Sequence, residues 1–262
     1  MKKAIIITSL AAVLSTNSQA DTLLGLYIGG QIWANQADGS FGEGELAEDQ
    51  TSFSFKDKTQ SNYFIALEHP IPLIPNLKIA STTLDTKGNT DLQSQFTFGG
   101  QTYDVNAHVD AVFDLSYIDY TFYYELFDND LLTIDFGLTA RDIDTHISAS
   151  SIYSSDTEEG GQNTITSELG GSGIVPMLYV STIVGLPFTG FNVFAEGNFA
   201  SYDDQTLYDY QVGVSYEVLD NLAVDLNVML GYRSMKLELN DLDDLYSDLT
   251  FDGVFVGTIV HF

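Results

Sequence analysis

The chain has 262 residues, of which 44% are hydrophobic and 13% aromatic, and its formal net charge at pH 7 is −28. So strong a negative charge excludes nucleic acid as a partner, because the phosphate backbone would be repelled. The chain contains no cysteine, which excludes disulfides, thiolate metal ligands and cysteine nucleophiles.

Residues 1–20 have the pattern of a cleaved signal peptide. Lys2 and Lys3 supply a positive start, residues 4–14 are apolar, and Ser18-Gln19-Ala20 is a small-residue cleavage site. The alternative, a membrane anchor, is disfavoured because a spanning helix needs roughly twenty apolar residues. We expect the mature chain to begin at Asp21 and to form one domain over residues 21–262.

The acidity of the mature chain has two interpretations. Without the two signal lysines, 9 − 2 = 7 basic residues face 37 acidic ones, so the formal charge is 7 − 37 = −30. The first interpretation is a solvated surface that resists aggregation. The second is capture of divalent cations or permeation that favours cations.

Short alternating segments predict ten β-strands after Asp21, separated by connections that are alternately long and short. The predicted strands cover residues 23–34, 59–68, 77–86, 111–124, 131–143, 174–184, 190–201, 206–218, 221–236 and 250–262. The short connections are 69–76, 125–130, 185–189 and 219–220; the long ones are 35–58, 87–110, 144–173 and 237–249, with a shorter one at 202–205. This asymmetry is typical of a transmembrane antiparallel up-and-down β-barrel, whose periplasmic turns are tight and external loops long.

The number of strands is constrained by where the two ends lie. An even number puts both ends in the periplasm, as the expected signal peptide and final strand require. The main alternative is eight strands, with segments 59–68 and 77–86 not spanning.

The last third of the chain has the clearest alternation. In segment 221–236, Leu222, Val224, Leu226, Val228, Leu230 and Tyr232 alternate with Ala223, Asp225, Asn227, Met229, Gly231 and Arg233. Such a long strand, apolar on one side, predicts a wall between lipid and a polar interior rather than a soluble sandwich.

The final strand resembles the C-terminal signature of bacterial outer-membrane β-barrel proteins. Val254, Val256, Val260 and Phe262 share one face of this strand, and Phe262 is the terminal aromatic residue. With the signal pattern and the alternation, the whole chain resembles uncharacterised small outer-membrane barrel proteins of Gram-negative bacteria. The resemblance implies location in the cell outer membrane and insertion by the barrel insertion machinery, which would recognise the strand ending in Phe262.

Facing membrane lipid on one side, the barrel would have a polar and mostly acidic interior. We expect Glu68, Lys78, Asp119, Asp135, Arg141, Glu196, Asp209, Glu217, Asp225 and Arg233 to point inward. Ten strands are far fewer than the sixteen or more that leave an aqueous channel. We therefore expect a plugged lumen in which the cations pair with carboxylates, with a narrow cation-preferring pore as the alternative.

Carboxylates also gather in the predicted loops, which suits hard cations such as calcium or magnesium. They are Glu43, Glu45, Glu48, Asp49, Asp156, Glu158, Glu159, Asp241, Asp243, Asp244 and Asp248. The last group lacks the glycine and distal Glu of an EF-hand loop, so no metal site is assigned. These carboxylates are expected to stay solvated, or to meet lipopolysaccharide phosphates through shared divalent ions. Glycines 160, 161, 170, 171 and 173 are expected to keep the third loop flexible.

His146 is the best candidate for catalysis, because omptin-type proteases and lipid-modifying barrel enzymes need a histidine at the outer rim. Asp142, Asp144 and Ser148 lie near it in sequence and offer an orienting carboxylate and a hydroxyl. They share one strand end, whereas an omptin site needs pairs facing each other across the mouth. His108 is expected to be a loop residue without organised neighbours, and His69 and His261 to lie at the periplasmic end.

Together these patterns predict an outer-membrane barrel that is not an enzyme and has no catalytic, cofactor or metal residues. Its expected role is structural or adhesive, and its partners are outer-membrane lipid and lipopolysaccharide. The alternatives are a narrow cation-preferring pore and an omptin-like or lipid-modifying enzyme.

Overall fold

The computed structural model describes residues 24–44, 49–129, 131–154, 162–221, 224–242 and 245–262. The expected signal peptide at residues 1–20 and the expected cleavage before Asp21 lie outside this part of the chain. Among the described residues, no helix has the length and apolar character to cross a bilayer.

The described residues form β-strands almost throughout. The strands are β1 (Gly25–Glu43), β2 (Thr51–Ser52), β3 (Ser54–Phe55), β4 (Lys58–Glu68), β5 (Asn76–Thr82), β6 (Asp85–Asp91), β7 (Phe96–Phe98), β8 (Gln101–Tyr103), β9 (His108–Asp114), β10 (Tyr117–Asp128), β11 (Leu132–Ser154), β12 (Gln162–Leu186), β13 (Phe191–Tyr202), β14 (Gln205–Asn221), β15 (Val224–Leu242) and β16 (Leu245–His261).

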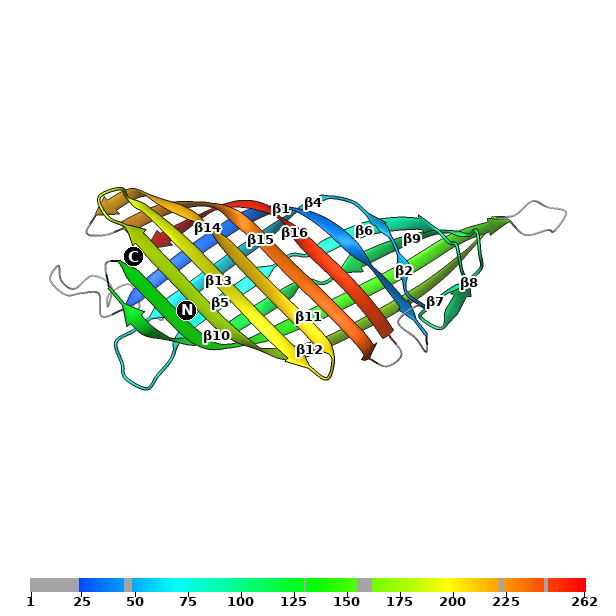
Figure 1. Ribbon diagram of the computed structural model, residues 1–262, viewed down its shortest axis with the longest axis horizontal. Helices are drawn as coiled ribbons and strands as arrows, with labels where there is room; N and C mark the ends of the chain where they lie inside the picture. The colour runs from blue at the N-terminus through cyan, green and yellow to red at the C-terminus, as the bar shows by residue number, and fades with distance from the viewer. Residues whose placement is uncertain (1–23, 45–48, 130, 155–161, 222–223, 243–244) are drawn as a thin grey trace, which may run out of the picture.

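Ten antiparallel strands close into a barrel, as predicted (Figure 1). The wall runs β1, β4, β5, β10, β11, β12, β13, β14, β15 and β16, and β16 pairs with β1 to complete the circle. Strands β6 and β9 continue β5 and β10 after short breaks, and they pair with each other. Because β4 and β5 both belong to the wall, the eight-stranded alternative is wrong.

The strands are much longer than predicted. Strand β1 runs to Glu43, β11 to Ser154 and β15 to Leu242, so most of the predicted loops 35–58, 144–173 and 237–249 are strand. Glycines 170, 171 and 173 lie within β12, which corrects the expectation that they belong to a flexible loop. Glycines 160 and 161 lie outside the described residues.

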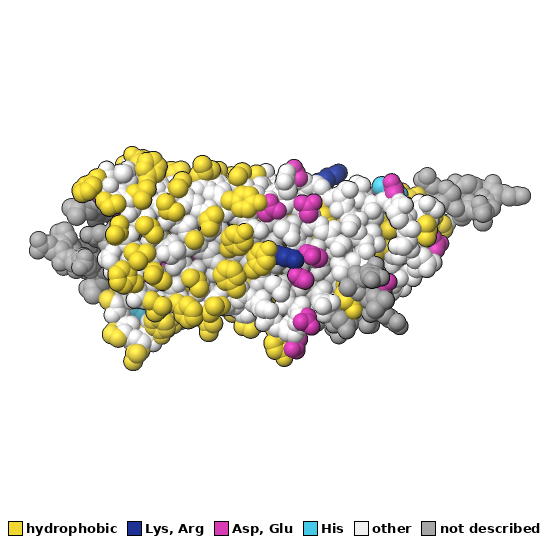
Figure 2. Space-filling model, in the orientation of Figure 1, with side chains coloured by type: hydrophobic (Ala, Val, Ile, Leu, Met, Phe, Trp, Pro, Cys, Tyr) yellow, Lys and Arg dark blue, Asp and Glu magenta, His cyan; other side chains and the backbone are white. Residues whose placement is uncertain are grey.

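The outer face of each long strand changes from apolar to polar along its length. On β1, Ile28 and Ile32 are 45% and 55% exposed, but Gln36 and Asp38 occupy the same face further along. Figure 2 shows the result on one face: hydrophobic side chains cover the half of the molecule in which β1 begins and β16 ends (Figure 1), and acidic side chains gather beyond them. The apolar half matches the lipid-facing band of an outer-membrane barrel.

The inner face of the wall changes from polar to apolar along the same direction. The side chains predicted to point inward do lie on the inner face, and Asp119, Asp135, Arg141, Asp209 and Arg233 are buried there. Beyond them, the extracellular half holds an apolar core. We call this the extracellular core; it includes Trp33, Phe41, Phe53, Leu84, Leu92, Phe96, Phe98, Tyr103, Phe113, Ile147, Met235, Leu249 and Phe251.

Candidate functional site in the barrel lumen

A group of paired charges crosses the lumen where the polar interior meets the extracellular core. We call it the ion-pair layer; it consists of Tyr117, Asp119, Arg141, Asp209 and Arg233. Alternation places each of these side chains on the inner face, from β10, β11, β14 and β15. The layer therefore joins the neighbouring strands β10 and β11 to the neighbouring strands β14 and β15, which β12 and β13 separate in the wall.

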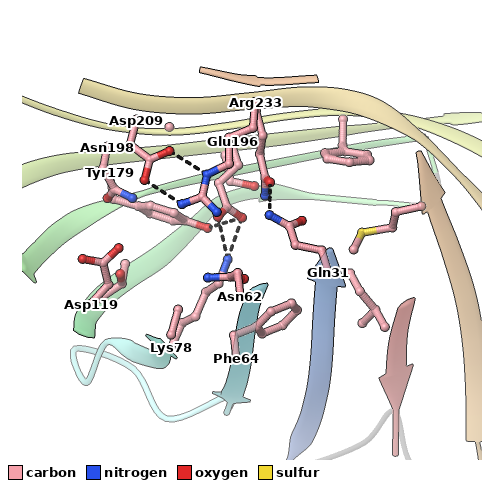
Figure 3. Close-up of a pocket in the computed structure, with 18 of the residues that line it drawn as sticks. Gln31, Asn62, Phe64, Lys78, Asp119, Tyr179, Glu196, Asn198, Asp209 and Arg233 are labelled. Carbon is pink, nitrogen blue, oxygen red and sulfur yellow. Dashed lines mark hydrogen bonds and ion pairs between the residues drawn. The ribbon is translucent and has the colours of Figure 1, made fainter. Parts of the chain in front are cut away.

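Asp209 is the centre of this layer. Its carboxylate accepts hydrogen bonds from Arg141 Nη2 at 2.8 Å, from Arg233 Nε and Nη2 at 2.8 and 2.7 Å, and from the Tyr117 hydroxyl at 2.6 Å. Figure 3 shows the contact between Asp209 and Arg233. Two arginines converge on one carboxylate, so removing that carboxylate would leave Arg233 without its carboxylate partner and Arg141 with Asp119 alone.

Arg141 carries the connection to the other side of the lumen. Its Nε and Nη2 each donate to Asp119 at 2.8 Å, a two-point contact, and its side chain has no exposed surface. The guanidinium also lies 3.7 Å from the centre of the Tyr117 ring, which favours the cation. Such charge-assisted, two-point contacts fix the geometry of the layer.

A small polar cavity lies on the membrane side of the ion-pair layer. Its volume is about 120 Å³, and polar side chains including Asn62, Thr121, Ser181 and Asn198 line it together with Phe64 and Phe194. Ligand pockets usually have volumes of roughly 300–1,000 Å³. The cavity therefore suits water molecules better than a metabolite.

Two further contacts cross this cavity (Figure 3). Lys78 Nζ donates to both carboxylate oxygens of Glu196 at 2.7 Å, and Gln31 Nε2 donates to Gln211 Oε1 at 3.0 Å. All three predicted inward cations thus pair with carboxylates, as expected from the sequence.

Aromatic rings fill the interior beyond the ion-pair layer. The ring of Phe41 lies 4.6 Å from that of Phe53, and it meets the rings of Phe96, Phe98 and Phe113 edge-on at 4.7–5.4 Å. Phe96 and Phe98 come from the β7–β8 hairpin. This hairpin is also held by the Tyr103 hydroxyl, which donates to the Ala149 carbonyl at 2.8 Å.

His146 and its sequence neighbours do not form a site at the barrel mouth. Asp142, Asp144, His146 and Ser148 lie at alternate positions of β11, opposite in direction to the buried Arg141 and Ile147, so they share the outer face. The hydrogen bonds of the described residues include none from His146 to a carboxylate, and no group of three metal-ligating side chains occurs among those residues.

His108 does have organised neighbours, contrary to the sequence expectation. Its Nδ1 lies 2.7 Å from Asp91 Oδ1, and its Nε2 lies 4.0 Å from Asp110 Oδ1. The hydrogen bond that His108 donates to the Asp91 carboxylate raises the pKa of His108 above its ordinary value. At the opposite end of the barrel, His261 stacks on Tyr27 with ring centres 4.2 Å apart.

Several carboxylates of the predicted acidic loops lie outside the described residues: Glu45, Glu48, Asp156, Glu158, Glu159, Asp243 and Asp244. Among the others, Glu43 ends β1, and Asp248 lies in β16 beside Lys236 at 3.3 Å. These two residues therefore belong to strands, not to loops.

The arrangement of the strands resembles that of known outer-membrane proteins. The outer membrane protease OmpT of Escherichia coli has a TM-score of 0.53 and 12% sequence identity, covering 95% of this chain and 99% of that one. Neisserial surface protein A gives a TM-score of 0.29 at 11% identity, covering 90% and 96% of the two chains. The toluene transporter TodX of P. putida gives 0.29 at 9% identity, covering 92% and 90%. No family model matches the chain, and no curated protein matches its sequence.

At these sequence identities the similarity establishes the fold alone. The conclusion rests on OmpT, whose TM-score is 0.53. Together with the closed barrel and its apolar outer band, it defines the class: the chain is an outer-membrane β-barrel protein of the kind found in Gram-negative bacteria. Its place in the cell is the outer membrane.

Proposed function

We propose that this protein is a non-conducting, non-catalytic barrel whose long extracellular part has a structural or adhesive role. The observation that carries the proposal is the filling of the lumen at two successive levels. The ion-pair layer joins β10, β11, β14 and β15 across the interior, and the extracellular core lies beyond it.

Ion flow would require both levels to open. The Arg141 side chain has no exposed surface, and that of Asp209 is 4% exposed, so neither is solvated as a pore-lining charge would be. The apolar core offers a permeating ion no polar partners, and burying an unpaired ion costs many kcal/mol. These features support occlusion over the narrow cation-preferring pore.

Planar-bilayer recording of the refolded mature protein tests the proposal. We expect no steady current in a salt gradient, while a refolded porin in the same bilayer gives steps. Steady cation-selective steps would overturn the proposal in favour of the pore. Asp209, Glu196 and Asp225 would then be the first residues to neutralise.

The proposal that the barrel is non-catalytic is supported by the position of His146. The similarity to OmpT concerns the fold, whereas a protease needs its histidine and carboxylates to converge on a substrate. Here His146 shares the outer face of one strand with Asp142 and Asp144. We expect no cleavage of basic peptides; cleavage that disappears in His146→Ala would establish the omptin-like alternative.

The proposed partners follow from the two ends of the apolar band. Acidic side chains begin where the band stops (Figure 2), so they would meet lipopolysaccharide phosphates through shared divalent cations.

Val254, Val256 and Phe262 are 57%, 52% and 47% exposed, and we propose that the insertion machinery binds this face of β16. Slower insertion of Phe262→Ser than of Thr258→Ser would support that role.

A further inference from the structure

One edge of the extracellular sheet has no partner strand among the residues that the structure describes. Strand β12 pairs with β11 over residues 162–184, but on its other side β13 pairs only with residues 178–186. In Figure 1 the β11–β12 hairpin extends well past the end of β13 and β14. The tip of the β7–β8 hairpin contacts β12 at Ser167 and Glu168. We call residues 169–175 the β12 edge.

The β12 edge is open on both faces. Gly170, Gly171, Ser172, Gly173 and Ile174 are consecutive and all exposed, and Ile174 is 69% exposed. A side chain added at Gly171 or Gly173 would meet no atom within 4 Å. Neither the extracellular core nor another described strand therefore covers this backbone.

In the extracellular half, other strand edges of the same wall have hydrogen-bonding partners. The Gln205 side chain donates to the Asn240 carbonyl at 2.7 Å and accepts from the Asn240 N–H at 2.8 Å, as a neighbouring strand would. The outer part of β1 is paired with β2, at Phe41 with Thr51. Proteins commonly block exposed edges because unpaired backbone groups bind other strands. Against this background, the β12 edge is an exception.

Pro176 shows which backbone groups are free. Proline has no N–H, yet β12 stays paired with β11 across Pro176, opposite Ala140. The nitrogen of Pro176 therefore faces away from β11, where proline is tolerated in a sheet. Since backbone direction alternates along a strand, the N–H groups of Ile174, Ser172 and Gly170 face the same open side.

The charges around this edge favour a basic partner. Glu168 lies on the outer face of β12, and Asp142 and Asp144 lie on the same face of β11, opposite Ile174 and Ser172. Asp203 and Asp204 form the exposed turn between β13 and β14. Across β11 to β14 the sole lysine or arginine is Arg141, which is buried inside, and the one histidine, His146, lies on the outer face opposite Gly170. On the inner side of the edge, Leu169 and Val175 are half-buried and apolar.

We propose that the β12 edge binds an extended, basic polypeptide segment of an extracellular partner by strand addition. Backbone hydrogen bonds to β12 would hold the segment, as in other complexes formed by adding a strand to a sheet edge. Its outward side chains would be Lys or Arg, next to Glu168, and its inward side chains apolar, next to Leu169 and Val175. This inference rests on the proposed adhesive role, for which it specifies the partner.

A designed probe tests the inference on the full-length folded protein in detergent. The probe is a fluorescent eight-residue peptide in which lysine alternates with valine, and its binding is followed by anisotropy. Two control peptides carry glutamate in place of lysine, or N-methyl groups on alternate backbone nitrogens. The protein variants are Ser172→Pro, which removes an N–H on the open side, and Ser172→Ala, which keeps it.

We expect the lysine peptide to bind, and Ser172→Pro to weaken binding by about tenfold, in keeping with the loss of one or two hydrogen bonds. Ser172→Ala should stay within about twofold of the wild type, since it alters no backbone group. N-methylation should weaken binding to the wild type by about tenfold or more, and this result does not depend on the folding of any variant.

Three results would overturn the inference: no binding at about 1 mM peptide, a concentration that would detect even a Kd in the millimolar range; equal binding of the methylated peptide; or equal binding of the glutamate peptide. The bilayer recording tests occlusion separately. A silent bilayer with no peptide binding would remove the β12 edge and leave the proposed occlusion standing. A conducting barrel that binds the peptide would overturn the proposed occlusion and support binding at the β12 edge.

Discussion

The two halves of the barrel use the same strands with opposite polarity. In the membrane half, Ile28 and Ile32 of β1 face outward and Gln31 faces inward; in the extracellular half, Asp38 faces outward and Phe41 inward. Outside the wall, the surroundings change from lipid to water. Inside the wall, the side chains change from polar to apolar, and the ion-pair layer lies near that change. One continuous strand therefore satisfies the rules for a membrane barrel and for a water-soluble sheet in turn.

Removing the Asp209 carboxylate should have the largest effect on stability. Asp209→Ala leaves Arg141 and Arg233 buried without their shared partner, and breaking such a pair costs about 3–5 kcal/mol. Urea unfolding in detergent measures the loss. Tyr117→Phe is the matched control, because it removes a single hydrogen bond to Asp209, a loss of about 1.5–3 kcal/mol for a charged acceptor. An equal loss in the two variants would contradict a layer centred on Asp209.

Truncating Phe41 should destabilise the extracellular half selectively. Phe41→Ala removes a ring that contacts four other phenylalanines and should cost about 3 kcal/mol. Hydrogen exchange should then speed up in β7, β8 and the outer part of β1, while amides of the membrane half stay protected. Phe41→Leu, which keeps most of the volume, should have a smaller effect. Uniform loss of protection over the whole barrel would mean that the halves are not separable.

A lysine placed on the outer face should distinguish the two halves directly. Val228→Lys puts a charge on the lipid-facing side of β15 and should cost about 2–4 kcal/mol near the bilayer centre. Gln36→Lys lies on the outer face of β1 beyond the apolar band and should cost about 0.5 kcal/mol or less. Unfolding from lipid vesicles measures both. Equal losses of stability in the two variants would contradict a membrane boundary between Val228 and Gln36.

The smallest effect concerns His108 on the extracellular surface. Its hydrogen bond with Asp91 raises its pKa, so NMR titration should give a value above that of Asp91→Asn. A raised pKa in the folded state means that the pair contributes stability below the ordinary pKa of histidine, about 6.5. That contribution is lost as the pH rises through the folded-state value. Identical pKa values of His108 in the two proteins would contradict the pairing of His108 with Asp91.

Sequence patterns alone predicted the barrel and the inward charges, because both depend on a period of two. Once Val228 and Leu230 face lipid, Arg233 must face the lumen. The pairing of Arg233 and Arg141 with a single carboxylate, Asp209, could not be predicted. It depends on the register and curvature of two strand pairs, β10–β11 and β14–β15, that are distant from each other in sequence.

The extracellular core was missed because the apolar pattern changes phase. On β1 the outward apolar residues stop after Ala34, which predicts the end of a strand. Yet Trp33, Ala37 and Phe41 continue an apolar pattern on the other face, shifted by one residue. Phe96-Thr97-Phe98 also alternates, but it is too short to predict a strand without its partner in β8. The full length of β1 is therefore apparent only when alternation on both faces is considered together.

The central claim is that the lumen is filled on the extracellular side of the ion-pair layer, whereas a small cavity remains on the membrane side. Because the chain has no cysteine, single cysteines can measure this with a small, charged thiol reagent. Ala37→Cys lies in the extracellular core, where Ala37 is 7% exposed, and Ser215→Cys lines the cavity. In detergent, where both ends of the barrel are accessible, we expect Ala37→Cys to react about a hundredfold more slowly than Ser215→Cys. Equal rates at the two positions would contradict the claim.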